Sequence, residues 1–126
     1  MSNEHAAAIF KLQADICKTL ADPNRLMILH ELRTGELSVG EIVKRLGLSQ
    51  SNVSRHLALL RERAIVRTRR DGTTIYYSLA NPKIGQACDL VRDMLEAQLG
   101  ASRQLSKSLN LLAGGSYRIT GSGRKK

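Results

Sequence analysis

The chain has 126 residues, which suits one domain with a modest core that a partner subunit would usefully enlarge. Lys and Arg outnumber Asp and Glu by 20 to 11, and the formal net charge of +9 favours a polyanion or an anionic membrane surface as partner. No apolar run approaches the roughly 20 residues that span a bilayer, and MSNEH lacks the pattern of a signal peptide. We therefore expect a cytoplasmic protein without a membrane partner.

Two helices are predicted in the first third of the chain. Residues 6–21 carry apolar side chains at steps of three and four, which indicates an amphipathic helix. Asp22 suits an N-cap and Pro23 suits a first helical position, so a second helix is expected over residues 23–33. The apolar positions of the two helices are Ile9, Phe10, Leu12, Ile16 and Leu20, and then Leu26, Ile28, Leu29 and Leu32.

A helix-turn-helix is predicted next. Ser38 and Glu41 have the spacing of a capping box, and Gly47 stands where a left-handed residue ends a short helix. Ser49, two residues later, suits the N-cap of a fourth helix. The expected buried positions are Ile42, Val43 and Leu46 in the third helix, and Val53, Leu57 and Leu60 in the fourth. Two short helices joined by so tight a turn are typical of this motif.

The fourth helix has a small polar face near its start. This face consists of Gln50, Ser51, Asn52, Ser54 and Arg55. In the DNA major groove Gln and Asn pair with adenine edges and Arg pairs with guanine, whereas a bulky apolar face would be excluded. The same residues are also ordinary at a solvated helix start. His56 falls beside the buried face, so we interpret it as a packing or hydrogen-bonding residue.

The stretch IVRTRRDGTTIYYSL is rich in β-branched and aromatic residues and has Asp71-Gly72 in its middle, which predicts a two-stranded hairpin. Arg67, Arg69 and Arg70 are expected at or near its tip, where they would contact a nucleic-acid backbone. An arginine cluster can also simply protect a sheet edge from aggregation. A helix-turn-helix followed by a basic hairpin favours nucleic-acid binding.

The helical repeat returns at Pro82 and is expected to continue to Leu109, over about seven turns. A stripe of that length usually packs against another long helix, so we expect it to pair with its copy in a second subunit, together with the first helix. The glycine-rich, basic residues 114–126 are expected to form a flexible tail after a domain of residues 1–113.

The order of these elements, with LADPNRLMIL, ELSVGEIVKRLGLSQSNVSRHLALLRE and VRTRRDGTTIYYSL, resembles the ArsR/SmtB family of winged-helix repressors over residues 9–99. The resemblance implies a mainly α fold with a small β-hairpin wing (α+β), which dimerises through its first and last helices. It implies a sequence-specific repressor that binds a palindromic operator in double-stranded DNA. Base contacts would come from Gln50, Ser51, Ser54 and Arg55, and wing contacts to the backbone from Arg69, Arg70 and Thr73.

Members of that family leave DNA when a metal, an arsenical or an oxidant binds, but most of the known ligand sets are missing here. Thiolate metal sensors carry two cysteines where this chain has Ser38 and Gly40, and zinc sensors carry Asp, His or Glu ligands where it has Asn81, Lys83, Met94 and Ala97. Dithiol persulfide sensors carry a cysteine near the position of His30. We expect no metal and no cofactor. Cys17 and Cys88 remain as candidates for sensing an oxidant, a sulfur species or a metalloid, and the alternative is that both are small buried apolar residues.

The sequence also bears on two other classes of function. An enzyme is not expected, because the chain has no glycine-rich phosphate loop, no His-Glu-x-x-His and no Gly-x-Ser-x-Gly. A constitutive or architectural DNA-binding protein without an effector would use the same fold, and it stays open as the alternative to a regulated repressor.

Overall fold

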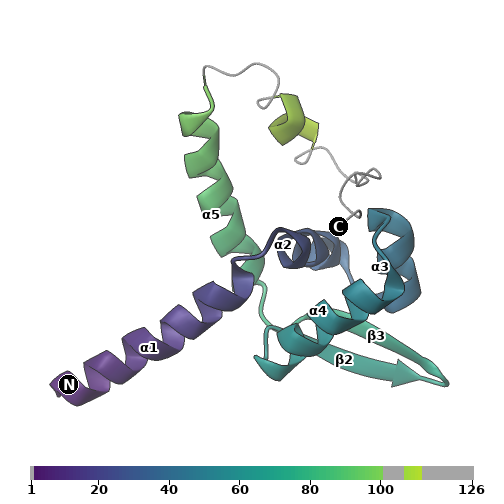
Figure 1. Ribbon diagram of the computed structural model, residues 1–126, viewed down its shortest axis with the longest axis horizontal. Helices are drawn as coiled ribbons and strands as arrows, with labels where there is room; N and C mark the ends of the chain where they lie inside the picture. The colour runs from purple at the N-terminus through teal and green to yellow at the C-terminus, as the bar shows by residue number, and fades with distance from the viewer. Residues whose placement is uncertain (1, 101–106, 112–126) are drawn as a thin grey trace.

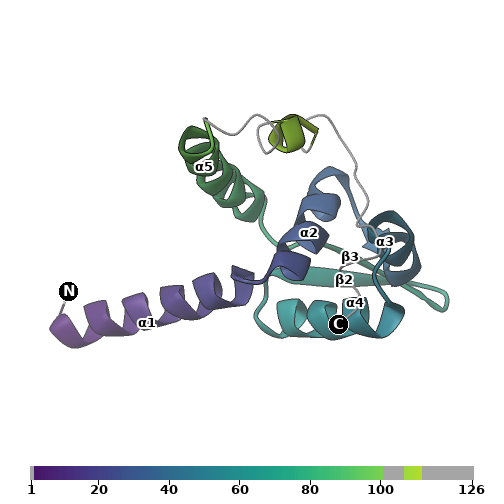
Figure 2. The ribbon, with the colours of Figure 1, turned by 45° about the horizontal axis from the view of Figure 1, so that its top comes forward.

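The computed structural model describes residues 2–100 and 107–111. In chain order the elements are α1 (Asn3–Leu20), α2 (Pro23–Glu31), the 3-10 turn η1 (Leu32–Thr34), β1 (Leu37–Ser38), α3 (Val39–Leu46), α4 (Gln50–Glu62), β2 (Val66–Asp71), β3 (Thr74–Leu79) and α5 (Lys83–Gln98). The helices α2, α3 and α4 gather around the β2–β3 hairpin, while α1 and α5 extend away from this body (Figure 1). A second view shows the same arrangement (Figure 2).

Side-chain caps start α2, α3 and α4 where the sequence predicts them, whereas α1 begins at Asn3, three residues earlier than predicted, and is capped by Ser2. The Asp22 carboxylate accepts hydrogen bonds from the backbone N–H groups of Asn24 and Arg25, at 2.9 and 3.1 Å. Ser38 and Glu41 form both bonds of the capping box. Gly47 adopts a φ of +74°, a left-handed conformation that a side chain would strain, and it turns the chain directly towards α4. The predicted helix-turn-helix is confirmed.

The core lies between α2, α3, α4 and the sheet. Its fully enclosed side chains are Ile28, Leu29, Ile42, Leu46, Val53, Leu57 and Leu60. The prediction for Leu26 is wrong, because this side chain is 41% exposed and points away from that core. The core is therefore built mainly from the helix-turn-helix and the helix before it, which fixes the outward face of α4.

The sheet has three antiparallel strands in the order β1-β3-β2, so the hairpin gains one strand that the sequence did not predict. β1 has only two residues, and a pair is too short to show a period of two. In the hairpin Asp71 lies opposite Thr74, and Gly72 has a φ of +66° in the turn between them. The register places Arg67 opposite Ser78, near the base of the hairpin, so the expectation of three arginines at the tip is corrected to two.

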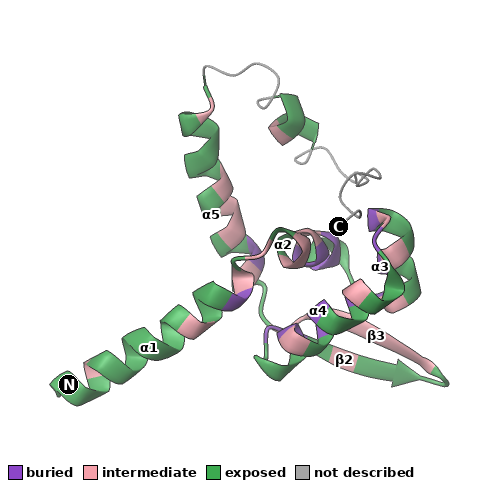
Figure 3. Ribbon diagram, viewed as in Figure 1, coloured by how far each residue is buried: buried purple, intermediate pink, exposed green. Residues whose placement is uncertain are grey.

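Most residues of the helices α1 and α5 are exposed (Figure 3), and large apolar side chains are among them. In α1 a single described residue, Thr19, is buried. The exposed apolar residues are Ile9, Phe10, Leu12 and Ile16 on α1, and Leu90, Val91, Met94 and Leu95 on α5. No helix in the described part of the chain is long and apolar enough to cross a membrane.

The last helix is shorter than predicted. It ends at Gln98, because Leu99 leaves the helical conformation and Gly100 lies in the turn that follows. The apolar repeat continues to Leu109, but it does not continue the same helix; residues 107–111 are helical. The predicted tail, residues 114–126, lies outside the described residues.

An ion pair anchors α5 to the core. The Arg33 guanidinium donates to both carboxylate oxygens of Asp89, at 2.7 and 3.0 Å. Gly85 makes room for it, because a Cβ there would clash with the Arg33 side chain. The orientation of α5 is thus tied to η1 by packing at a glycine as well as by charge.

Candidate nucleic-acid interface

The first turns of α4 present the predicted polar face to solvent. Gln50, Ser51, Ser54 and Arg55 are exposed, whereas Asn52 is half-buried. The Asn52 side-chain oxygen accepts a hydrogen bond from the Arg55 guanidinium at 2.6 Å, which orients the arginine along the helix surface. Ser49 caps the helix by accepting from the Asn52 N–H at 3.2 Å. The face is small and polar, with backbone N–H groups at its end, and such a surface fits a major groove.

The opposite face of α4 is held by the core and by one polar contact. His56 is 7% exposed, and its Nδ1 lies 3.3 Å from the Arg25 guanidinium. The Arg25 Nε in turn donates to the Thr19 carbonyl at 2.6 Å, so one side chain joins the end of α1 to α4. Burial is the main cause that lowers the pKa of His56, with Arg25 and Arg55 acting in the same direction and Asp22 opposing them. The predicted hydrogen-bonding role of His56 is confirmed.

The arginines of the hairpin differ in what they contact. Arg67 donates to the Ala80 carbonyl, so it closes the base of the hairpin. Arg69 binds the Glu36 carboxylate with two hydrogen bonds and lies over the Tyr76 ring. Within the described residues no hydrogen bond or ion pair engages the Arg70 side chain, which is exposed, as is Thr73 in the turn.

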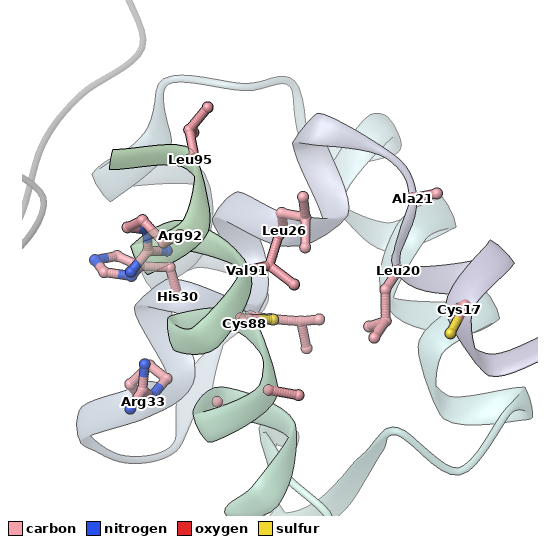
Figure 4. A pocket seen from close by; sticks show the side chains of 13 residues that line it. Cys17, Leu20, Ala21, Leu26, His30, Arg33, Cys88, Val91, Arg92 and Leu95 are labelled. Carbon is pink, nitrogen blue, oxygen red and sulfur yellow. The ribbon is translucent and has the colours of Figure 1, made fainter. Parts of the chain in front are cut away.

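Both cysteines line one apolar cavity of about 440 Å³, where the end of α1 meets α2 and α5. The two thiols are free, and their sulfur atoms lie on opposite sides of the cavity with Leu20 between them (Figure 4). Cys17 is exposed, whereas Cys88 is half-buried. Burial raises the pKa of the Cys88 thiol, although Arg92 and Arg33 partly oppose this effect. A raised pKa lowers the thiolate fraction of Cys88, which slows its reaction as a nucleophile.

A metal centre finds no support in the described residues, because they contain no group of three or more His, Cys, Asp or Glu side chains placed to hold an ion. His30 also lines the cavity, and burial is the first cause that lowers its pKa, with Arg92 adding to the effect. The cavity wall is mostly aliphatic, which suits neither a hard nor a borderline metal ion.

The sequence shows no sign of three long-range contacts, made by Arg25, Glu36 and Arg33, that hold the elements around this interface. Arg25 is 31 positions from His56, and Glu36 is 33 positions from Arg69. Arg33 is 56 positions from Asp89. Pairs so distant leave no local pattern, and only the fold brings them together.

A helix-turn-helix followed by an antiparallel hairpin defines a winged helix-turn-helix, and the protein is a DNA-binding transcriptional regulator. It belongs to the arsR family of bacterial regulatory proteins, whose family model matches residues 22–68. The HTH-type transcriptional regulator Rv0081 of Mycobacterium tuberculosis is 39% identical over 109 residues, which cover 86% of this chain and 94% of the relative.

Two solved structures are similar to this chain in their fold. The crystal structure of Rv0081 superposes with a TM-score of 0.67, covering 74% of this chain and 94% of that one. The solution structure of the homodimeric winged helix-turn-helix domain of Mb0332 from Mycobacterium bovis is 30% identical, with a TM-score of 0.71 over 82% of this chain and 94% of that one. A biofilm growth-associated repressor of Xylella fastidiosa is 40% identical over 85 residues, which are 68% of this chain and 75% of the relative.

Proposed function

We propose that the protein is a homodimeric repressor that binds a palindromic operator in double-stranded DNA. The observation that carries this proposal is the exposed apolar surface of α1 and α5, on helices that extend away from the body holding α4 and the hairpin. Large exposed apolar patches on a small protein mark interaction sites. A second copy of the chain would cover this surface while leaving both polar α4 faces open. The homodimeric domain from Mycobacterium bovis and the repressor from Xylella fastidiosa support this reading.

In the proposed complex each α4 lies in a major groove. Gln50, Ser51, Ser54 and Arg55 contact base edges, and Asn52 orients the arginine. Arg70 and Thr73 at the hairpin tip contact the neighbouring phosphates. Two copies of α4 related by a twofold axis require two half-sites related in the same way, and this is the reason for a palindrome. A dimer bound at the operator would repress transcription of the adjacent gene.

The test compares two DNA fragments of equal length: the region upstream of the gene for this protein and a shuffled version of it. We expect the upstream fragment to bind at least about 1,000-fold more tightly at physiological salt, because specific sites typically exceed non-specific DNA by that margin. Fluorescence anisotropy measures both affinities across a salt series. Equal affinities that both fall steeply with salt would instead support the architectural alternative, which needs only phosphate contacts.

We further propose that a thiol-reactive signal at Cys17 and Cys88 releases the operator. The supporting observation is that both cysteines line one cavity between the end of α1 and α5. Because the sulfur atoms lie on opposite sides, a bridge between them would draw the two helices together, and Arg25 joins the end of α1 to α4. A disulfide, a polysulfide or a bound As(III) would each make such a bridge.

An oxidant or As(III) is then expected to weaken operator binding at least about tenfold, a coupling of ordinary size for an allosteric protein. The double variant Cys17→Ser/Cys88→Ser should bind the operator as the wild type does and should not respond. Anisotropy with and without the reagent measures both. An unchanged affinity in the treated wild type, or an equal loss in the double variant, would reject thiol sensing and leave a constitutive repressor.

A further inference from the structure

Arg69 is the most fully engaged of the hairpin arginines. Its Nε donates to one carboxylate oxygen of Glu36 at 3.0 Å, and its terminal NH2 donates to the other. The same guanidinium lies 4.9 Å from the centre of the Tyr76 ring. One edge of the planar group is thus used by a bidentate pair and one face by an aromatic ring, which fixes its position and orientation.

These contacts cross the sheet. In the strand order β1-β3-β2, Tyr76 belongs to the central strand and lies opposite both Ser38 and Arg69. Glu36 directly precedes β1, which leads into α3. The Arg69 side chain therefore spans β3, over the Tyr76 ring, and joins the outer strand of the hairpin to the segment that starts the helix-turn-helix.

The Glu36 carboxylate neutralises the charge of Arg69. The hydrogen bond from Arg69 is the main cause that lowers the pKa of Glu36, and the same bond raises the pKa of Arg69. Both groups stay ionised across the physiological pH range, so their opposite charges cancel and the pair attracts a phosphate only weakly. Arg70 follows on the other face of the strand and has no such partner in the described residues.

We propose that Arg69 and Glu36 are positioning residues: their pair, held over Tyr76, sets the angle between the hairpin and α4, while Arg70 makes the phosphate contact. The proposal rests on the proposed contact between the hairpin and DNA. It assigns different tasks to two adjacent arginines that look equivalent in the sequence. With the pair intact, the hairpin tip meets the backbone beside the groove that α4 occupies.

The experiment measures the affinity of the full chain for the upstream DNA fragment across a salt series. For Arg70→Gln we expect the slope of log K against log[salt] to become shallower by about 1.8 for a dimer, about 0.9 for each of two lost phosphate contacts. For Arg69→Gln and Glu36→Gln we expect a loss of about threefold to tenfold at physiological salt, with a slope close to that of the wild type, because no phosphate contact is lost. The double variant Arg69→Gln/Glu36→Gln should lose no more than either single variant.

Arg69→Lys separates the two roles of the arginine. Lysine keeps the charge but cannot form the bidentate pair, so a positioning role predicts a loss as large as that of Arg69→Gln. Melting temperatures serve as the control and should stay near that of the wild type, because exposed ion pairs contribute little to stability.

Three results would overturn the proposal: a shallower slope for Arg69→Gln, tighter binding by Glu36→Gln, or wild-type binding by Arg69→Lys. Each would make Arg69 a phosphate contact for which Glu36 competes. An unchanged slope for Arg70→Gln would instead contradict the hairpin contact of the proposed function. The two failures are therefore distinguishable in one set of titrations.

Discussion

Replacing Leu90 or Met94 with glutamate is expected to convert the proposed dimer into a folded monomer and to weaken operator binding by about 100-fold or more. These side chains are 70% and 60% exposed in the single chain, so the substitutions leave the core intact. In a dimer formed through α5 each would bury an unpaired charge, which costs roughly 3–5 kcal/mol. Light scattering after size exclusion measures the mass, and anisotropy measures the affinity.

Glu96→Gln is the control for this prediction. Glu96 is an exposed residue of α5, and a step of two residues from Met94 places it on the other side of the helix, so a one-unit change of charge there should leave both mass and affinity close to those of the wild type. Dimers of undiminished operator affinity in both Leu90→Glu and Met94→Glu would show that α5 does not form the interface.

The second large effect is expected at the start of α4. Arg55→Ala and Gln50→Ala should each weaken operator binding by about 10-fold to 100-fold, because one good bidentate base contact is worth roughly 1–3 kcal/mol of discrimination. The affinity for shuffled DNA should change much less, since phosphate contacts dominate there. Competition titrations with the two fragments measure the ratio directly.

Arg61→Ala provides the comparison at the other end of the same helix. Arg61 is exposed in the last turn of α4, beyond the polar face, so its loss should lower both affinities alike and leave their ratio unchanged. If Arg55→Ala behaved in the same way, Arg55 would be a backbone contact and the reading face would have to lie elsewhere on α4.

Local chemistry explains why so much of the fold could be predicted from the sequence. Asp22, Ser38 and Ser49 each cap a helix through a side chain that reaches only two or three residues along the chain. Gly47 and Gly72 adopt positive φ angles, which few other residues adopt without strain. Such signals depend on neighbours in sequence, and the structure confirms them.

The remaining features depend on tertiary contacts. β1 is a strand because Leu37 and Ser38 pair with β3, about 40 positions away. The apolar repeat beyond Gln98 suggested one long helix, but periodicity cannot show whether a helix is interrupted at Gly100. Leu26 follows the helical repeat of α2, yet it lines the cavity that α2 shares with α1 and α5 and stays outside the core.

The candidate site was predictable in part for the same reason. The polar face of α4 follows from helical periodicity, and the structure exposes four of its five residues while Asn52 is half-buried. The sequence could not separate the roles of the hairpin arginines, because their partners lie outside the hairpin. Glu36, the partner of Arg69, directly precedes β1, and Ala80, the partner of Arg67, follows β3. Likewise, the sequence singled out both cysteines as candidates for sensing, but the cavity that separates their sulfur atoms is a product of packing.

Hydroxyl-radical footprinting on the upstream fragment tests the central claim most directly, namely that a dimer places two α4 helices in successive major grooves. The wild type should protect two symmetric half-sites whose centres lie about one helical turn, roughly 10 base pairs, or a multiple of it apart. Leu90→Glu at the same concentration should leave both half-sites unprotected. A single protected segment without twofold symmetry, or uniform protection along the fragment, would contradict the account.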